Sequence, residues 1–226
     1  MTRKQLQLVC IAVLAASVAP IHGFAQDTAP DPQGPLDTRA NTGLVIGAKV
    51  GGGLGLGPLG ASPVGEIEIG YLLPLPEPIG RSLELFMSAQ YMQPGTDGHT
   101  TAPDPRLPGD GTMTYNVKQQ VLPLTFGLLY RIPMSGDAFM PYAAAGVRVM
   151  MLKTTVSGSA GDQSFGSNDE TSTSAGGYFA VGADIFLGPG ALVAELQLGY
   201  APIDGFVLRE TNTSNVALAL GYRFIL

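Results

Sequence analysis

The chain has 226 residues, a formal net charge of −6 and a single cysteine. Hydrophobic residues make up 45% of it and charged residues only 13%, whereas about a quarter of a typical soluble domain is charged. This deficit indicates that much of the surface does not face water. The acidic balance and the scattered Lys and Arg residues argue against nucleic acid as a partner.

The first 25 residues have the three zones of a secretory signal peptide. A basic start at Arg3 and Lys4 is followed by an apolar run over residues 6–18, and small residues precede Gln26. This run is shorter than the roughly 20 residues that a membrane-spanning helix needs. We therefore predict a signal peptide over residues 1–25, cleaved after Ala25, and an exported mature chain without disulfides.

Residues 26–42 are rich in proline and have no periodicity, which predicts a flexible periplasmic lead-in. From residue 43 onward, eight segments alternate apolar side chains with small, polar or charged ones, as β-strands do. Each segment has about ten residues, the length of a tilted strand that crosses the hydrocarbon layer of a membrane. The segments are 43–52, 64–73, 82–92, 119–131, 139–152, 177–187, 191–200 and 215–226.

The connections between these segments alternate in length. The short ones are 74–81, 132–138 and 188–190, and the longer, mostly polar ones are 53–63, 93–114, 153–176 and 201–214. Membrane barrels have short periplasmic turns and long external loops, whereas a soluble β-sandwich has no reason to alternate in this way. Only helices and closed barrels satisfy their backbone groups in lipid, and no segment after the signal peptide is long and apolar enough for a membrane-spanning helix. We therefore predict an all-β fold. It is an eight-stranded antiparallel up-and-down transmembrane β-barrel over residues 43–226.

Acids and bases on the inward face of these strands are nearly balanced in number. An eight-stranded barrel has an interior just wide enough for side chains to fill, and charges buried there must pair. We predict a salt-bridged plug in two layers, an external one around Lys49 and Arg148 and a periplasmic one around Arg131 and Arg223. It either holds the barrel together or lines a narrow polar path. The predicted acids are Glu66, Glu68 and Glu195 for the external layer and Glu84 and Asp184 for the periplasmic layer.

Aromatic residues cluster at the two ends of the outward face, as the interfacial girdles of membrane barrels do. The alternative interpretation is that strand ends simply favour tyrosine. The predicted girdle comprises Tyr71, Tyr130, Tyr222 and Phe224 at the short-turn end and Tyr91, Phe179 and Tyr200 at the long-loop end.

Other candidate motifs lack the context that their chemistry needs. Gly55–Gly60 match the dinucleotide pattern G-x-G-x-x-G, but Pro58 and the next alternating segment leave no helix for such a site. His99, the only histidine beyond the signal peptide, has no serine at a defined spacing, and we interpret it as a solvated loop residue. The Ser/Gly/Asp-rich residues 157–175 lack EF-hand spacing and are predicted to form a mobile external loop. We expect no catalytic residue, cofactor or metal site.

Three stretches resemble the small outer-membrane β-barrel families of the OmpA-barrel, OmpX and OmpW type. Val121–Arg131 is similar to their proline-containing descending strand, Pro141–Val147 to the strand that follows, and Gly221–Phe224 to the C-terminal signal read by the barrel-assembly machinery. Here Ile225 and Leu226 follow that signal, although family members usually end on an aromatic residue. The resemblance implies a monomer in the outer membrane of a Gram-negative bacterium, in contact with membrane lipid.

Three classes of function fit these features. The long, polar and charge-poor loops favour a non-enzymatic structural or surface-interaction role. A narrow channel for small solutes is the alternative that the OmpW type allows. A lipid-modifying enzyme, which would need His99 beside a serine and an acid, is the least favoured of the three.

Overall fold

The computed structural model describes residues 42–55, 59–76, 79, 81–100, 106, 108–109, 111–134, 138–202 and 214–226. The predicted signal peptide and the lead-in up to residue 41 lie outside these residues. Within the described part of the chain, no helix has the length and apolar character needed to cross a membrane.

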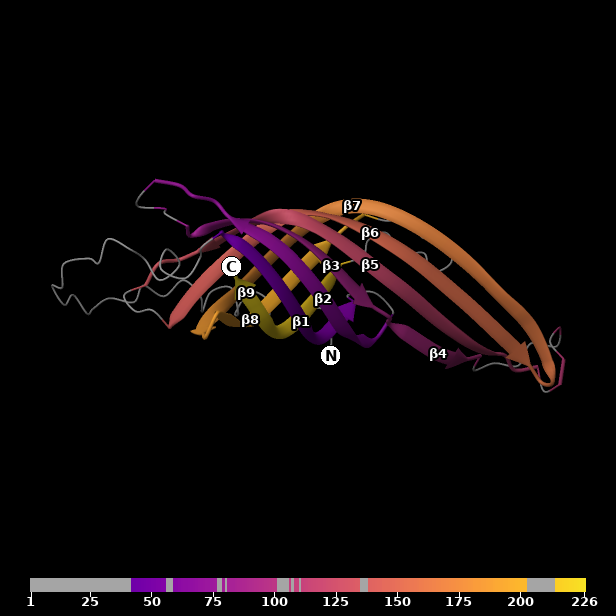
Figure 1. The fold of residues 1–226 in the computed structure, drawn as a ribbon. Coiled ribbons are helices and arrows are strands. Elements are labelled where there is room, and N and C mark those ends of the chain that lie inside the picture. Colours follow the sequence, from indigo (N-terminus) through magenta and orange to yellow (C-terminus); the bar gives the residue numbers. More distant parts are fainter. Residues whose placement is uncertain are drawn as a thin grey trace, which may run out of the picture. The chain divides into compact units, whose positions relative to one another are not determined.

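The described residues form nine antiparallel strands in one sheet that closes on itself (Figure 1). Neighbours in the chain pair with each other except for β3 and β4, β1 pairs with β9, and the pairing of β3 with β5 completes the ring. The strands are β1 Leu44–Gly55, β2 Ala61–Leu72, β3 Leu83–Met92, β4 Gly95–His99, β5 Thr114–Arg131, β6 Phe139–Ala160, β7 Gln163–Leu187, β8 Gly190–Tyr200 and β9 Asn215–Ile225.

β4 continues the path of β3 along the same neighbour, β5, after an interruption at Gln93 and Pro94. Proline has no backbone N–H to donate to a ladder, which accounts for a break at this point. β3 and β4 therefore count as one strand of the barrel. The predicted eight-stranded antiparallel up-and-down barrel is confirmed, and each of the eight alternating segments coincides with a strand.

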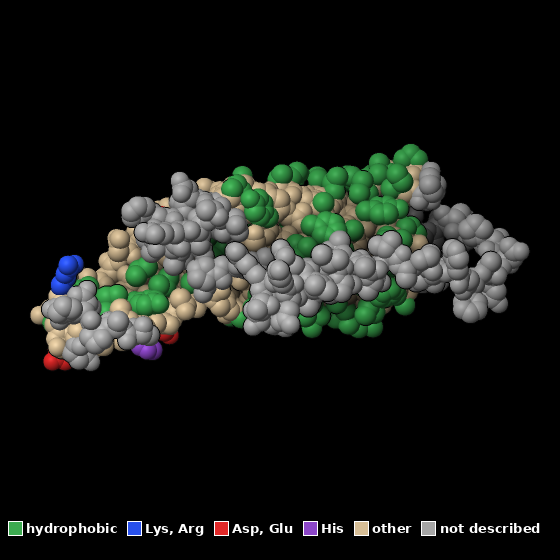
Figure 2. All heavy atoms as spheres, turned by 180° about the vertical axis from the view of Figure 1, so that it is seen from behind, with side chains coloured by type: hydrophobic (Ala, Val, Ile, Leu, Met, Phe, Trp, Pro, Cys, Tyr) green, Lys and Arg blue, Asp and Glu red, His purple; other side chains and the backbone are tan. Residues whose placement is uncertain are grey.

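The barrel is inside-out relative to a soluble protein. In β2, Ile67 is 67% exposed on the outer face, while Glu66 and Glu68 are each 4% exposed on the inner face. On the face shown in Figure 2, hydrophobic side chains form patches along the barrel, and the charged side chains that are visible lie at one end. Contact of such an apolar surface with water is unfavourable, whereas contact with hydrocarbon is favourable. We therefore expect the outer face to contact lipid.

Inward apolar side chains form a cluster at each end of the lumen. The cluster near the barrel termini consists of Val45, Leu72, Met140, Phe186, Ala191 and Ile225. The cluster toward the opposite, external end consists of Val64, Met92, Val121, Met150, Leu152, Ala201 and Ala217. The charged lumen residues lie between these two apolar clusters along the strands.

The prediction of a long external loop over residues 153–176 is wrong, because nearly all of this stretch belongs to β6 and β7. These strands pair up to Ala160 and Gln163, with a shift in register between Ser157 and Ser159, and Gly161, with φ of 55°, starts the two-residue turn between them. The Ser/Gly/Asp composition is typical of loops, but pairing across a hairpin satisfies the same backbone groups, and Gly-Asp suits a two-residue turn.

Four strands thus continue beyond the apolar band as an external sheet, which comprises residues 95–99, 114–120, 153–160 and 163–171 (Figure 1). Residues 93–114, predicted as one long loop, contain β4 and the start of β5, so this prediction is wrong in part. The outward face changes character within one step of the two-residue repeat, from Leu122 to Gln120 on β5 and from Met151 to Lys153 on β6. This step marks the external border of the lipid-facing band.

An exposed ion pair ties two strands of the external sheet together just above this border. Lys153 Nζ lies 2.9 Å from Asp169 Oδ2, and the Thr155 hydroxyl donates to Asp169 Oδ1 at 2.7 Å. The hydrogen bonds from Lys153 and Thr155 hold the pKa of the Asp169 carboxyl below its ordinary value. Both side chains of the ion pair are about half exposed, so the pair aligns the hairpin more than it stabilises the fold.

Candidate functional site

All nine charged residues predicted for the lumen lie inside the barrel and are at most 4% exposed. They are also all of the buried charged side chains among the described residues. Their exposed fractions are Lys49 2%, Glu66 4%, Glu68 4%, Glu84 0%, Arg131 0%, Arg148 0%, Asp184 0%, Glu195 2% and Arg223 0%.

Lys49, on β1, is surrounded by carboxylates. Its Nζ lies 2.8 Å from Glu66 Oε1, 2.9 Å from Glu68 Oε2 and 2.9 Å from Glu195 Oε1. Glu66 is the register partner of Lys49 on β2, whereas Glu195 reaches across from β8. The ammonium of Lys49 therefore connects β1 with β2 and β8 through the interior of the barrel.

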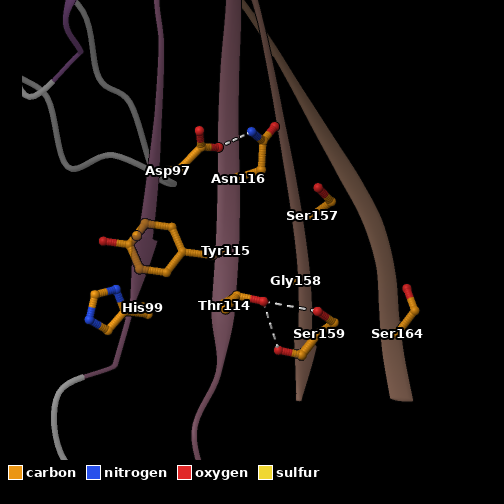
Figure 3. A pocket seen from close by; sticks show the side chains of 10 residues that line it. Asp97, His99, Thr114, Tyr115, Asn116, Ser157, Gly158, Ser159 and Ser164 are labelled. Atoms are coloured by element: carbon orange, nitrogen blue, oxygen red, sulfur yellow. Dashed lines mark hydrogen bonds between the residues drawn. The ribbon is translucent and has the colours of Figure 1, made fainter. Parts of the chain in front are cut away.

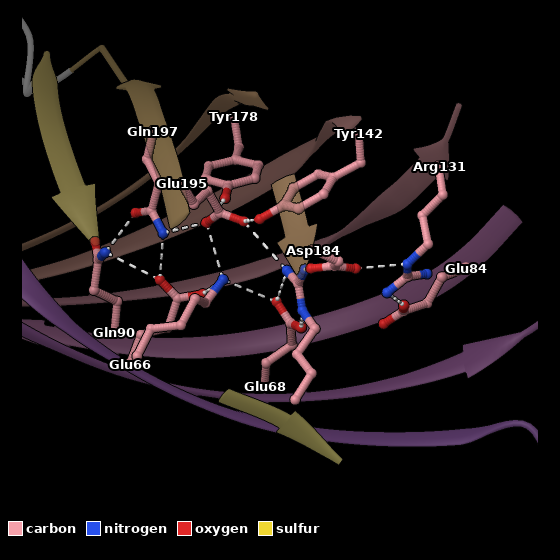
Figure 4. Close-up of polar contacts among 12 residues, drawn as sticks. Glu66, Glu68, Glu84, Gln90, Arg131, Tyr142, Tyr178, Asp184, Glu195 and Gln197 are labelled. Carbon is pink, nitrogen blue, oxygen red and sulfur yellow. Dashed lines mark hydrogen bonds and ion pairs between the residues drawn. The ribbon is translucent and has the colours of Figure 1, made fainter. Parts of the chain in front are cut away.

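Arg223 connects this group to the acids on the side of the barrel termini. Figure 4 shows these acids, Asp184 and Glu84, beside Arg131. Its guanidinium lies 2.6 Å from Glu68 Oε1, 2.8 Å from Asp184 Oδ1 and 3.2 Å from Glu195 Oε2. Asp184 also accepts from Arg131 at 2.7 Å, and Arg131 lies 2.7 Å from Glu84. The two predicted layers are thus one continuous network, because Arg223 binds acids of both.

The contacts of Arg148 differ from the prediction that it pairs with the acids of the external layer. Its Nε donates to Thr125 Oγ1 at 2.9 Å, and its guanidinium lies 4.3 Å from the centre of the Tyr178 ring. Among the described residues, no carboxylate lies within ion-pair distance of it, and both of its terminal nitrogens lack a hydrogen-bond partner. The balance of charges along the strands could not predict that Arg148 lacks an ion pair. Whether it meets a carboxylate depends on the positions of long side chains from other strands.

Uncharged polar groups complete the network, and the sequence analysis missed them. Gln197 donates to Glu66 at 2.7 Å and to Glu195 at 2.6 Å, while Gln90 donates to Gln197 at 2.7 Å. The Tyr142 hydroxyl donates to Glu195 at 2.6 Å. The inward positions of Gln90, Gln197 and Tyr142 in the alternating pattern could have indicated their role, since a buried amide or phenol needs a hydrogen-bond partner.

Inward-facing glycines leave the space that the long charged side chains occupy. A Cβ at Gly70 would fall 1.9 Å from Glu84 Oε1, and one at Gly199 would fall 2.7 Å from an Arg148 nitrogen. A Cβ at Gly182 would fall 2.6 Å from the Tyr142 ring. Part of the high glycine content of the strands therefore follows from the width of the barrel and not from turns.

Adding a methyl group at one of these glycines should disturb the network. We expect Gly70→Ala to lower the free energy of unfolding by about 1–3 kcal/mol, because the Glu84 carboxylate is held by Arg131 and cannot move aside freely. Equilibrium unfolding of the barrel in lipid vesicles measures this. The control is Gly65→Ala on the same strand, where a Cβ meets nothing within 4 Å. Equal stability of the two variants would contradict the packing argument.

The seven residues predicted for the aromatic girdle all lie on the outward face of their strands. Six of them are between 40% and 55% exposed, and the seventh, Tyr222, is half-buried. The Tyr222 hydroxyl donates to the carbonyl of Leu187 at 2.6 Å, and its ring lies 4.8 Å from that of Phe224. The exposed six are Tyr71, Tyr91, Tyr130, Phe179, Tyr200 and Phe224.

A polar pocket of about 560 Å³ lies on the external sheet (Figure 3). Its walls come from β4, β5, β6 and the start of β7. The interpretation of His99 as a loop residue is wrong, because it ends β4 and pairs with Thr114. The lining residues are Asp97, Gly98, His99, Thr114, Tyr115, Asn116, Ser157, Gly158, Ser159 and Ser164.

The closed antiparallel sheet, the apolar outer band and the ion-paired interior define a transmembrane β-barrel. A family model described as the outer membrane protein beta-barrel domain matches residues 11–224. The chain belongs to this family and is a protein of the Gram-negative outer membrane.

Solved outer-membrane barrels are similar to this chain at low sequence identity. Neisserial surface protein A has 16% identity and a TM-score of 0.49, with coverage of 82% of this chain and 98% of that one. OprG from Pseudomonas aeruginosa has 14% identity and a TM-score of 0.47, with coverage of 83% and 99%. The N-terminal barrel of OprF from the same organism has 15% identity and a TM-score of 0.41, with coverage of 81% of this chain and 98% of that one. Comparison with curated proteins gave no match.

Proposed function

We propose that this barrel is a non-enzymatic membrane anchor for a surface-interaction site on its external sheet. The observation that carries the proposal is the continuation of β5, β6 and β7 well beyond the apolar band. From Gln120 to Thr114, three steps of the two-residue repeat extend β5 by about 20 Å past the border. A barrel that only filled the membrane would not need this ordered sheet.

The edge of the external sheet supports a role in contacts with other molecules. β7 pairs with β8 only from Gly177 onward, whereas its pairing with β6 starts at Gln163. Within the described residues, the first part of β7 therefore has a strand on one side only. The edge of a sheet presents backbone groups that another chain can pair with.

The interior favours a structural plug over the channel alternative. The ion-paired network spans the lumen through Lys49, Arg223 and Arg131, and it lies between two apolar clusters along the strands. A solute would have to separate buried ion pairs, and leaving one charge of such a pair alone costs about 3–5 kcal/mol. These features support a lumen whose role is to hold the barrel together.

Planar-bilayer recordings test this part of the proposal. We expect conductance near zero for the wild type and for Glu66→Ala and Glu68→Ala, because the remaining side chains and the apolar clusters still fill the lumen. Steady ion conductance by the wild type, or discrete openings that these substitutions increase, would favour the narrow channel instead.

Shortening the β6–β7 hairpin tests the surface role. Residues 155–169 are replaced by Asn-Gly, which joins Thr154 to its register partner Glu170 and keeps the barrel intact. We expect proteoliposomes with the wild type to adhere to host-cell or bacterial surfaces and those with the shortened protein to adhere several-fold less. Equal adhesion, with both barrels folded by heat-dependent gel mobility, would remove the proposal.

A further inference from the structure

We propose that the pocket on the external sheet binds an uncharged carbohydrate, of the size of a mono- or disaccharide. This inference rests on the proposed surface role and names the chemical class of the partner. The volume of about 560 Å³ falls within the range of small-molecule sites. The pocket also lies beyond the lipid-facing band, at the level where cell-surface sugars are found.

The register of the sheet directs two rows of polar side chains toward the pocket. One row runs from Asp97 through Asn116 to Ser157, since these residues are direct partners on β4, β5 and β6. The second row lies one two-residue step away and contains His99, Thr114 and Ser159. Directly opposite residues of an antiparallel pair lie on the same face, so hydroxyl, amide and carboxylate groups face one region of space.

Hydrogen bonds between these side chains organise the pocket before any ligand arrives. The Asn116 amide donates to the Asp97 carboxylate, and the Thr114 and Ser159 hydroxyls lie 3.0 Å apart (Figure 3). Asn116 uses one of its two N–H donors in this bond and keeps the other donor and its carbonyl acceptor. A planar amide beside a carboxylate matches the neighbouring hydroxyls of a sugar, each of which can both donate and accept.

The rings of Tyr115 and His99 both lie beside β4, but on opposite faces of the sheet, because Gly98 and Tyr115 alternate along their strands with the residues of the two polar rows. The Tyr115 ring packs against Gly98, where a Cβ would fall 2.2 Å from a ring carbon, so only glycine allows this position. Tyr115 remains 38% exposed, and Figure 3 shows its ring and that of His99 beside β4. His99 belongs to the second polar row, so its ring, and not that of Tyr115, is the aromatic surface that a sugar bound by these rows would meet.

Charge and polarity narrow the class of ligand. The lining includes the acid Asp97 and neither Lys nor Arg, so a phosphate, a sulfate or an acidic sugar would meet repulsion without a cation to offset it. Its side chains are mostly hydroxyls, amide and carboxylate, which do not suit an acyl chain or an apolar peptide. A neutral saccharide satisfies the hydrogen bonds and adds no charge.

Saturation-transfer NMR on the barrel in lipopolysaccharide-free nanodiscs tests the inference. The probes are maltose, lactose and a dephosphorylated core oligosaccharide released from lipopolysaccharide. We expect transfer to at least one of them, weakened about tenfold by Asn116→Ala or His99→Ala through loss of hydrogen bonds or of ring contact. The matched control is Ser167→Ala, a neighbour in the same sheet outside the pocket lining, which should leave transfer unchanged.

The outcomes separate this inference from the proposed surface role. Transfer to the core oligosaccharide alone identifies the cell's own envelope as the source of the ligand, and transfer to a disaccharide identifies a free or foreign glycan. No transfer to any probe, or equal transfer with Asn116→Ala, overturns the carbohydrate site even if hairpin shortening still abolishes adhesion. Loss of transfer in both pocket variants, combined with unchanged adhesion after hairpin shortening, supports the site and overturns the surface role instead.

Discussion

Replacing Arg223 by methionine should lower the free energy of unfolding by about 3–5 kcal/mol, the cost of leaving buried charges without their partner. Arg223 is fully buried and is shared by Glu68, Asp184 and Glu195. Methionine fills much of the same space but leaves these carboxylates without a cation that they now share. Urea-induced unfolding in lipid vesicles, followed by circular dichroism and by heat-dependent gel mobility, measures the loss.

Arg148→Met is the matched control for this experiment. Arg148 is equally buried, but among the described residues it bonds to Thr125 and stacks on Tyr178 without an ion pair. We expect its replacement to change stability by no more than about 1 kcal/mol, because a modest hydrogen bond is lost while an unpaired buried cation is removed. Similar losses in the two variants would show that volume, and not charge pairing, stabilises the interior.

Introducing arginine at Val147 should destabilise the barrel by about 2–4 kcal/mol, the cost of a cation at the midplane of the lipid-facing surface. Val147 lies in the middle of the outward face of β6 and is 62% exposed, and its register partner on β5 is Phe126. The guanidinium would have to reach across apolar neighbours to find water. The same unfolding measurement in vesicles detects this effect, which should be absent for conservative changes such as Val147→Ile.

Thr155→Arg provides the comparison at a different depth on the same strand and the same face. Thr155 lies beyond the step from Met151 to Lys153, where the outward face becomes polar. We expect a cost of about 0–1 kcal/mol there, as for cations near the interface. A large cost at Thr155 would place the membrane border further along β6 and would put the lower part of the external sheet inside the lipid.

We expect the ion-paired interior and the external sheet to have complementary roles in this barrel. Lys49 and Arg223 each connect strands that are far apart in the sequence, which stabilises the circular arrangement of the strands. The longest strands, β6 and β7, use this rigid base to hold a hairpin above the membrane. A binding site on such strands is better ordered than one on a loop, and the proposed carbohydrate pocket is therefore built on paired backbone.

The eight membrane-crossing strand segments, their inward and outward faces and the nine buried charges could be predicted from the sequence. The reason is that side chains alternate along a strand with a period of two, so Glu66 and Ile67 must face opposite sides wherever the strand lies. Strand length and the alternation of short and long connections then selected a membrane barrel over a sandwich. These are local properties, which each segment carries by itself.

Only the tertiary structure decided which charges meet, where the external sheet ends and which residues line the pocket. Among the described residues, Arg223 reaches acids of both predicted layers and Arg148 reaches none, because the register between strands and the space at inward glycines such as Gly199 set the contacts. Likewise, residues 153–176 resemble a loop in composition, yet they form strands because each segment supplies the backbone partners of the other. Pairing between distant segments is a non-local property, and the alternating pattern of a single strand contains no information about it.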